Sequence, residues 1–356
     1  MSLIVNAKLL AGELIFNYQN RRGYYRLSAC RKMLAVLVYH GLETDPRRLA
    51  ASGHRITPEG CLKEIRFFQQ QGYRLVSAEE IEKTGFGRED DGAGYLLVSF
   101  DDGHANIFPY LKRWTEVERV PVLLGICPGI VEENGIYWWE EVRARFALMQ
   151  QPSVQIKGLD GTVLAFAQHE GEQFADCGRA ASHQELQHRL EQLRQQTRYI
   201  DRQQLRNSVY VHENMNWHQI IELSRNPLCS LASHSMYHEI ATQVSLEELR
   251  NRTQTSQELI ESRTGRPVRH YVYPNGSFSD ETDQLLADLG IVHTYTTECA
   301  LNLIPFGMRL NRLNGYDLEN RSLRHYGERW KTWHVISDNI IDSGVVSNSP
   351  VNAITN

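Results

Sequence analysis

Short apolar runs alternate with segments whose apolar residues recur at helical spacing along most of the chain. Continuous apolar runs bounded by polar or turn residues are typical of buried strands. The runs expected to form strands are 33–40, 73–76, 94–100, 120–127, 228–233, 270–273, 291–297 and 307–313. Helices are expected between most of them, at about 57–72, 105–117, 217–225, 245–264 and 279–289. Strands separated by helices predict a parallel α/β architecture, either a barrel or a doubly wound sheet.

Several helix ends carry recognisable capping residues. Thr57 stands at an N-cap position, with Pro58 at the first helical position. Ser77 begins a capping-box pattern for the next helix. Gly265 and Gly290 fit the C-cap positions of the two later helices.

The stretch from about 132 to 215 interrupts the alternation. It contains "GIYWWEEVRARFALMQ", a predicted hairpin around 159–161, and a polar segment over 182–205 that reads as one long helix. We interpret it as a largely helical insertion, a lid or docking surface, within a catalytic domain over 33–330. Residues 1–32 then form an N-terminal extension, and residues 331–356 form a polar tail that is typical of poor order.

Composition narrows the class of protein. The chain has 38 basic and 43 acidic residues and a net charge of -5, without a long run of like charge, so nothing indicates nucleic-acid binding. Its six cysteines form no CxxC pair, which favours reduced thiols in the cytoplasm. Lys8 and Glu13 interrupt the apolar N-terminus, so we expect a cytoplasmic protein without a signal peptide. Peripheral membrane association through the first 16 residues is the alternative to a plain packing helix.

Polar residues follow two of the predicted strands. Asp101 and Asp102 come directly after strand 94–100, and His234 and His238 follow strand 228–233. Active sites of parallel α/β proteins lie at these carboxyl ends. If the histidine segment turns helically, the spacing of four places both imidazoles on one face. Two histidines and one carboxylate leave metal positions open for a water molecule and a substrate oxygen.

The adjacent aspartates suggest two different roles. A cation neutralises the carboxylate that binds it, so the neighbouring carboxylate can stay ionised and take a proton. The competing interpretation is that the aspartates cap the next helix and the histidines are ordinary surface residues. We prefer the metal site because both sets stand at equivalent ends of two parallel-type strands.

Three motifs resemble those of the polysaccharide deacetylase family (carbohydrate esterase family 4), in the family's order. They are "VSFDDG" at 98–103, "SHSMYH" at 233–238 and "YVYPNG" at 271–276. The resemblance spans about residues 33–315. It implies a distorted (β/α)7–8 barrel that removes acetyl groups from an N-acetylated sugar with the help of a metal.

The resemblance also implies roles for individual residues. Asp101 would act as the base, and Asp102, His234 and His238 would bind one divalent cation. The backbone N–H of Asn275 would stabilise the oxyanion. Zinc is the metal expected first, while cobalt, nickel or iron would suit the same ligands.

Some family features are absent. Many members carry an arginine, paired with the catalytic aspartate, where this chain has Val272, and Arg312 is the candidate replacement. The usual C-terminal leucine-x-histidine motif is not found. His40 is the candidate proton donor, as in biofilm-polysaccharide deacetylases, because a histidine pKa near 6.5 suits that task. His104 is a second candidate acid, but we expect it to cap the next helix or line the rim.

The substrate is less defined by the sequence. Trp138 and Trp139 suggest a sugar-stacking wall, although buried core tryptophans are nearly as well supported, and Tyr273 and Pro274 are further candidate binding residues. We expect an N-acetylated glycan or glycolipid of the bacterial surface, or its precursor, handled at the inner face of the membrane. The alternatives are a deformylase or amidase acting on another N-acyl substrate, and a non-catalytic glycan-binding homologue.

Overall fold

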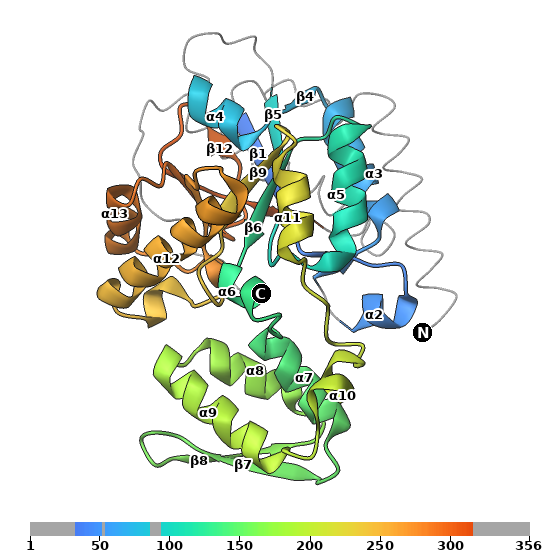
Figure 1. Cartoon of the computed structure of the whole chain (residues 1–356), viewed down its shortest axis with the longest axis vertical. Coiled ribbons are helices and arrows are strands. Elements are labelled where there is room, and N and C mark those ends of the chain that lie inside the picture. The colour runs from blue at the N-terminus through green and yellow to red at the C-terminus, as the bar shows by residue number, and fades with distance from the viewer. Residues whose placement is uncertain (1–32, 52–53, 86–93, 316–356) are drawn as a thin grey trace, which may run out of the picture. The chain divides into compact units, whose positions relative to one another are not determined.

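A computed structural model of the chain describes residues 33–51, 54–85 and 94–315 (Figure 1). The predicted N-terminal extension, its membrane-surface segment and the polar tail at 331–356 lie outside the described residues. Within the described part, no helix is both long enough and apolar enough to cross a membrane. Among the described residues, Cys61, Cys127, Cys177 and Cys229 are free cysteines.

The centre of the fold is a twisted sheet whose main strands all pair in parallel. In spatial order they are β1 (Met33–Tyr39), β5 (Gly94–Phe100), β6 (Val122–Ile126), β9 (Cys229–Ser233), β10 (His270–Val272) and β11 (His293–Tyr295). A further strand, β4 (Tyr73–Leu75), pairs with the first half of β5. These strands confirm the elements expected from the apolar runs.

The last strands nearly close the sheet into a barrel. The short strand β13 (Arg309–Leu310) pairs with β11, and β14 (Leu313–Asn314) pairs with β1 at the opposite edge. β12 (Asn302–Leu303) adds an antiparallel pairing at the start of β1. The predicted strand at 307–313 is therefore two short strands that join the two edges. This closure confirms the distorted barrel and excludes the doubly wound alternative.

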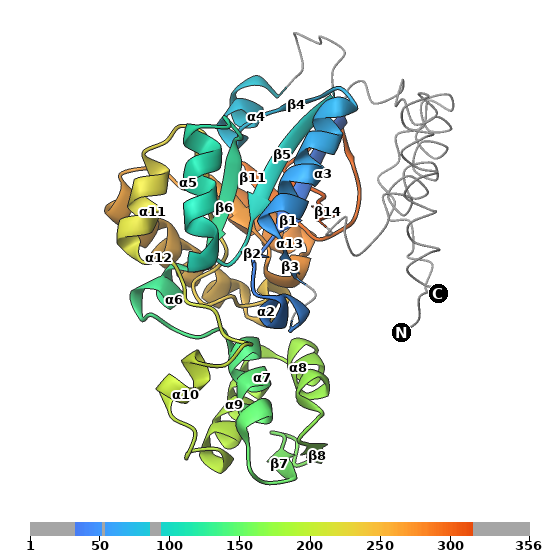
Figure 2. The same cartoon turned by 90° about the vertical axis from the view of Figure 1, so that its right-hand side faces the viewer.

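Helices surround the sheet (Figures 1 and 2). They are α2 (Pro46–Ala50), α3 (Pro58–Gln70), α4 (Ala78–Thr84), α5 (Phe108–Glu116), α6 (Pro128–Glu132), α11 (Trp217–Ser224), α12 (Leu246–Thr264) and α13 (Asp280–Asp288). The Thr57 side chain accepts a hydrogen bond from the Gly60 N–H, and Ser77 accepts one from the Glu80 N–H, as N-caps do. Gly265 and Gly290 follow their helices with positive φ, so the predicted C-terminal ends are confirmed.

Apolar side chains fill the barrel, and the polar residues of the candidate site follow the ends of its strands. Alternate strand residues form one buried cluster, which includes Leu34, Val36, Leu97, Leu123, Ala232, Val272, Tyr295 and Leu310. Strand periodicity explains this arrangement, because every second side chain points to the same face. The barrel thus acts as a rigid frame for the residues that follow each strand.

The predicted insertion forms a separate layer with its own apolar core (Figure 1, lower part). It contains α7 (Trp138–Leu148), β7 (Ser153–Lys157), β8 (Val163–Ala167), α8 (Gly171–Arg179), α9 (His183–Gln196) and α10 (Arg202–Arg206). The antiparallel pairing of β7 with β8 confirms the hairpin. The prediction of a single helix over 182–205 is wrong, because the segment forms two helices. α9 ends at Gln196, with Thr197 as its C-cap, and a capping box between Asp201 and Gln204 begins α10.

Candidate active site

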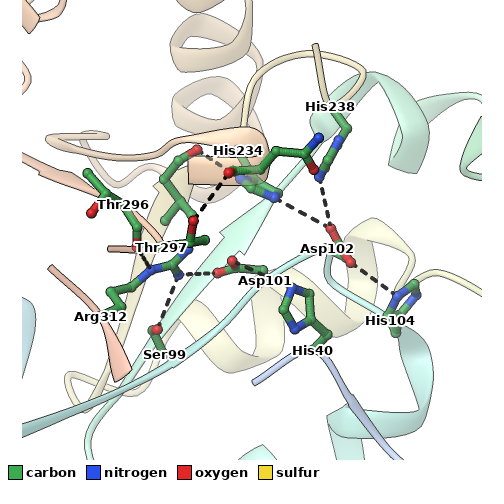
Figure 3. A network of polar contacts seen from close by, with 12 residues as sticks. His40, Ser99, Asp101, Asp102, His104, His234, His238, Thr296, Thr297 and Arg312 are labelled. Carbon is green, nitrogen blue, oxygen red and sulfur yellow. Dashed lines mark hydrogen bonds and ion pairs between the residues drawn. The ribbon is translucent and has the colours of Figure 1, made fainter. Parts of the chain in front are cut away.

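The carboxyl ends of the barrel strands surround a cavity of about 490 Å³. β1, β5 and β9 end directly before His40, Asp101 and His234, so each strand delivers one site residue (Figure 3). Nearly all the residues singled out from the sequence line this cavity. They are His40, Asp101, Asp102, His104, Trp138, Trp139, His234, His238, Tyr273, Asn275 and Arg312. Pro274 is buried in the turn that precedes Asn275.

Asp102, His234 and His238 form a compact, buried donor set. The Nε2 atoms of His234 and His238 lie 3.5 Å and 3.7 Å from Oδ1 of Asp102. These separations are too long for good hydrogen bonds. They are close to the roughly 3.4 Å between tetrahedral ligands that each lie about 2.1 Å from a metal. Among the described residues, Oδ1 of Asp102 has no hydrogen-bond partner.

A backbone contact fixes how His234 faces this set. Nδ1 of His234 lies 2.8 Å from the carbonyl oxygen of Val272, which can only accept, so Nδ1 carries the proton. In the neutral ring, Nε2 then presents its lone pair to Asp102. A lone pair and a carboxylate oxygen repel unless a cation lies between them. The donor set therefore fits a divalent cation. At the position without the family arginine, Val272 contributes its backbone carbonyl to this arrangement.

The histidine segment is a tight turn, so the helical geometry considered for it is wrong. Ser235 and His238 both have positive φ, at 60° and 63°. The Ser235 hydroxyl accepts a hydrogen bond from the Glu239 N–H at 2.8 Å, which closes the turn. The turn still brings the ring centroids of His234 and His238 within 4.7 Å of each other.

Asp101 pairs with Arg312, which lies between β13 and β14. Nη1 of Arg312 donates to Oδ1 of Asp101 at 2.8 Å, and Nε donates to the carbonyl oxygen of Thr296 at 2.7 Å. Burial raises the pKa of Asp101, but neighbouring positive charge, chiefly that of Arg312 together with its hydrogen bond, holds this pKa below its usual value. Asp101 is thus ionised at neutral pH. Arg312 thus pairs with Asp101, as expected for the replacement of the family arginine. Its catalytic role stays a prediction.

His40 lies on the other side of Asp101. Its Nε2 is 4.0 Å from Oδ2 of Asp101, and 28% of its side chain is exposed. Burial lowers the pKa of His40 to about 4, although the charges of Asp102 and Asp101 act in the opposite direction. The ordinary pKa expected from the sequence is therefore wrong. A neutral His40 can donate a proton only after it receives one, and Asp101 is the adjacent source.

Asn275 offers a free backbone donor in an unusual conformation. Its φ is 55°, and its N–H has no hydrogen-bond partner among the described residues, while its carbonyl accepts from the Thr297 hydroxyl at 3.2 Å. Gly276 follows with φ 70°, and a Cβ there would lie 2.5 Å from the Thr297 backbone nitrogen. Only glycine fits this approach. The close packing of Gly276 thus holds the Asn275 segment in place.

The two tryptophans have different surroundings. Trp139 stacks on Tyr137 with ring centroids 4.6 Å apart and lies 4.3 Å from the His238 ring. Trp138 packs against the core of the insertion. Both are partly exposed and line the cavity. The hydroxyl of Tyr273 donates to Asp283 at 2.7 Å. Trp139 is the better placed of the two to form a wall beside the metal donors.

A second group of site residues contains His104, which the sequence singled out, and two residues that it did not. His104 stands at the N-cap position of η1 (Ala105–Ile107), as expected, but its side chain makes no capping hydrogen bond. The side chain is 3% exposed, and its Nε2 lies 3.4 Å from Oδ2 of Asp102. Glu140 of α7 and His212, in the segment after α10, lie beside it. Glu140 follows the tryptophan pair, and His212 stands in the apolar run "VYVHEN". Nothing in the sequence indicates that these distant segments meet.

The fold and the site together give a barrel that carries a buried aspartate–histidine–histidine set at the ends of its strands. Residues 191–294 match the polysaccharide deacetylase family model. The match includes His234, His238 and Asn275, whereas Asp101 and Asp102 precede it. The predicted resemblance is confirmed. The matching family model describes polysaccharide deacetylases, so the predicted enzyme class, a hydrolase of linear amide bonds, is confirmed at the level of the family.

Solved structures support the fold. IcaB from Ammonifex degensii is 16% identical over 80% of this chain and 91% of its own, with a TM-score of 0.52. The Streptococcus pyogenes deacetylase PplD, solved with acetate, is 15% identical over 81% of this chain and 94% of its own, also with a TM-score of 0.52. At these identities the similarity establishes the barrel fold alone. No curated protein matches the chain.

Proposed function

We propose that this protein is a metal-dependent N-deacetylase of a bacterial surface glycan or its precursor. The observation that carries the proposal is one cavity that combines two features. The first is a buried Asp102–His234–His238 donor set, and the second is an ionised Asp101 paired with Arg312 beside it. A module that only binds glycans would need neither a buried base nor an unsatisfied ligand set.

A divalent cation in the donor set would polarise the acyl carbonyl and make a water molecule more acidic. The surrounding donors suit zinc first, and cobalt, nickel or iron as alternatives. His234 and His238 hold their lone pairs toward this position, and Asp102 supplies the negative charge.

The remaining residues provide the proton transfers. Asp101 takes a proton from the attacking water, and the Asn275 N–H donates to the oxygen that becomes negative. Because His40 starts neutral, the proton then passes from Oδ2 of Asp101 toward Nε2 of His40, 4.0 Å away. His40 delivers it to the nitrogen as the C–N bond breaks. The products are a free amine on the sugar and acetate.

The substrate and the place of action complete the proposal. Trp138 and Trp139 line the cavity and would stack on the apolar face of a sugar ring. We infer an N-acetylated glycan or glycolipid as the substrate, handled in the cytoplasm at the inner face of the membrane. Fractionation of cells that carry the tagged full chain tests the location.

Product analysis tests the reaction. We expect purified protein to release acetate and an equal amount of free amine from N-acetylglucosamine oligomers. Matched N-formyl oligomers and a small non-sugar acetamide serve as comparison substrates. Faster release of formate, or faster cleavage of the acetamide, would favour the deformylase or amidase alternative. Binding of the oligomers without any release would favour the non-catalytic homologue.

A further inference from the structure

Beside the Asp102–His234–His238 set lies a second group of potential metal ligands. His104, Glu140 and His212 each offer a donor atom, and these atoms lie within 4.8 Å of one another. All three side chains are buried, at 3%, 3% and 5% exposure. Buried ionisable groups normally satisfy their hydrogen bonds, yet Nδ1 of His104 and Nε2 of His212 have no partner among the described residues. Two unpartnered imidazole nitrogens and a carboxylate form a typical set for a transition metal.

The chain brings these three residues together by several specific contacts. The segment after Asp102 pairs with the one that returns from the insertion: the Ala105 N–H donates to the Glu213 carbonyl, and the Met215 N–H to the Gly103 carbonyl. Glu140 holds His212 at two points, through the backbone N–H at 3.2 Å and Nδ1 at 2.7 Å. The His104 and His212 rings lie 4.4 Å apart. Backbone and side-chain hydrogen bonds therefore hold the three residues in place.

The two groups meet at Asp102 and His104. Its Oδ1 faces His234 and His238, whereas its Oδ2 lies 3.4 Å from Nε2 of His104 (Figure 3). The second separation is also longer than a good hydrogen bond. The unpartnered Nδ1 of His104 is on the other side of the imidazole, so the His104 ring stands between Asp102 and the second group.

We propose that His104, Glu140 and His212 form a second divalent-cation site, which the His104 ring separates from Asp102 and the first donor set. Nitrogen and carboxylate donors favour zinc, cobalt, manganese or iron over calcium and magnesium. Nη2 of Arg55 lies 3.2 Å from Nδ1 of His212. This positive charge weakens cation binding at the second site relative to the first. The Asp102–His234–His238 site therefore fills first, and the second site fills at a higher cation concentration.

Metal binding by the full chain tests this proposal without relying on activity. After removal of metal by a chelator, we titrate the protein with Mn²⁺ and follow it by calorimetry and electron paramagnetic resonance. We expect about two ions per chain in two classes of affinity. Glu140→Gln and His212→Ala should each remove the weaker class and about one ion per chain, and leave the tighter class.

Controls separate this loss from a loss of folding. Glu140→Gln keeps the shape of the side chain, and circular dichroism verifies the fold of each variant. His169→Ala, at an exposed position of the insertion, should still bind both ions. Wild-type protein that saturates at one ion per chain, or a second ion that survives both variants, overturns the second site. Saturation at one ion with intact acetate release would leave the proposed function standing, whereas protein that binds no ion overturns both proposals.

Discussion

Asp101→Asn is expected to lower kcat by about 10²–10⁴-fold while metal binding stays intact. The amide has the same shape as the carboxylate but cannot accept a proton from water. It also leaves the buried guanidinium of Arg312 without a counter-ion, so the melting temperature should fall. Steady-state acetate release, metal content and circular dichroism on the same sample measure the three effects.

His234→Ala provides the contrast for this variant. It removes a cation ligand whose orientation Val272 fixes, so both metal content and turnover should be lost. The two variants therefore separate the base from the metal set. Near-normal turnover in folded Asp101→Asn protein would show that another group takes the proton.

Arg312→Met should shift the acid side of the kcat/KM profile upward by about 1–3 pH units. In the wild type, Arg312 is the chief group that holds the pKa of Asp101 below the ordinary 3.8. Without the guanidinium, burial dominates and the pKa rises. Acetate release measured between about pH 4 and pH 9 shows whether the acid limb of Arg312→Met moves into this range while that of the wild type stays below it.

The stability of the same variant has a defined pH dependence. A depressed carboxyl pKa stabilises the fold above the unfolded pKa, and this contribution is lost as pH falls through the folded pKa. The stability difference between wild type and Arg312→Met should therefore be largest near neutral pH and shrink in acid. Arg309→Met is the matched control, because Arg309 pairs with Asp280 and Asp283 instead. If Arg309→Met changed the pH dependence of stability as much as Arg312→Met does, the specific role of Arg312 would be contradicted.

The sequence predicts the barrel strands well because their signal is local. Strand 94–100 is found with the predicted bounds, since a continuous apolar run ends at two aspartates. The same logic places Asp101 and His234 at the carboxyl ends of β5 and β9, which lie on either side of β6 in the sheet. Because strand pairing then sets their positions, the local pattern is enough to predict that they meet.

Features that depend on distant segments are less predictable. Arg312 faces Asp101 because the closing strand divides into β13 and β14, each paired with a different edge of the barrel. His104, Glu140 and His212 meet only where the insertion returns to the sheet. The break between α9 and α10 is different, because Asp201 and Gln204 carry a local capping signal within a polar run that otherwise resembles one helix.

Chelation and reloading test the metal-dependent reaction most directly. Metal content and acetate release from N-acetylglucosamine oligomers are measured on one preparation before chelation, after chelation and after stepwise return of Zn²⁺. We predict that acetate release disappears with the metal and returns as the Asp102–His234–His238 set refills. Acetate release that continues at full rate in metal-free protein would contradict a catalytic role for the cation.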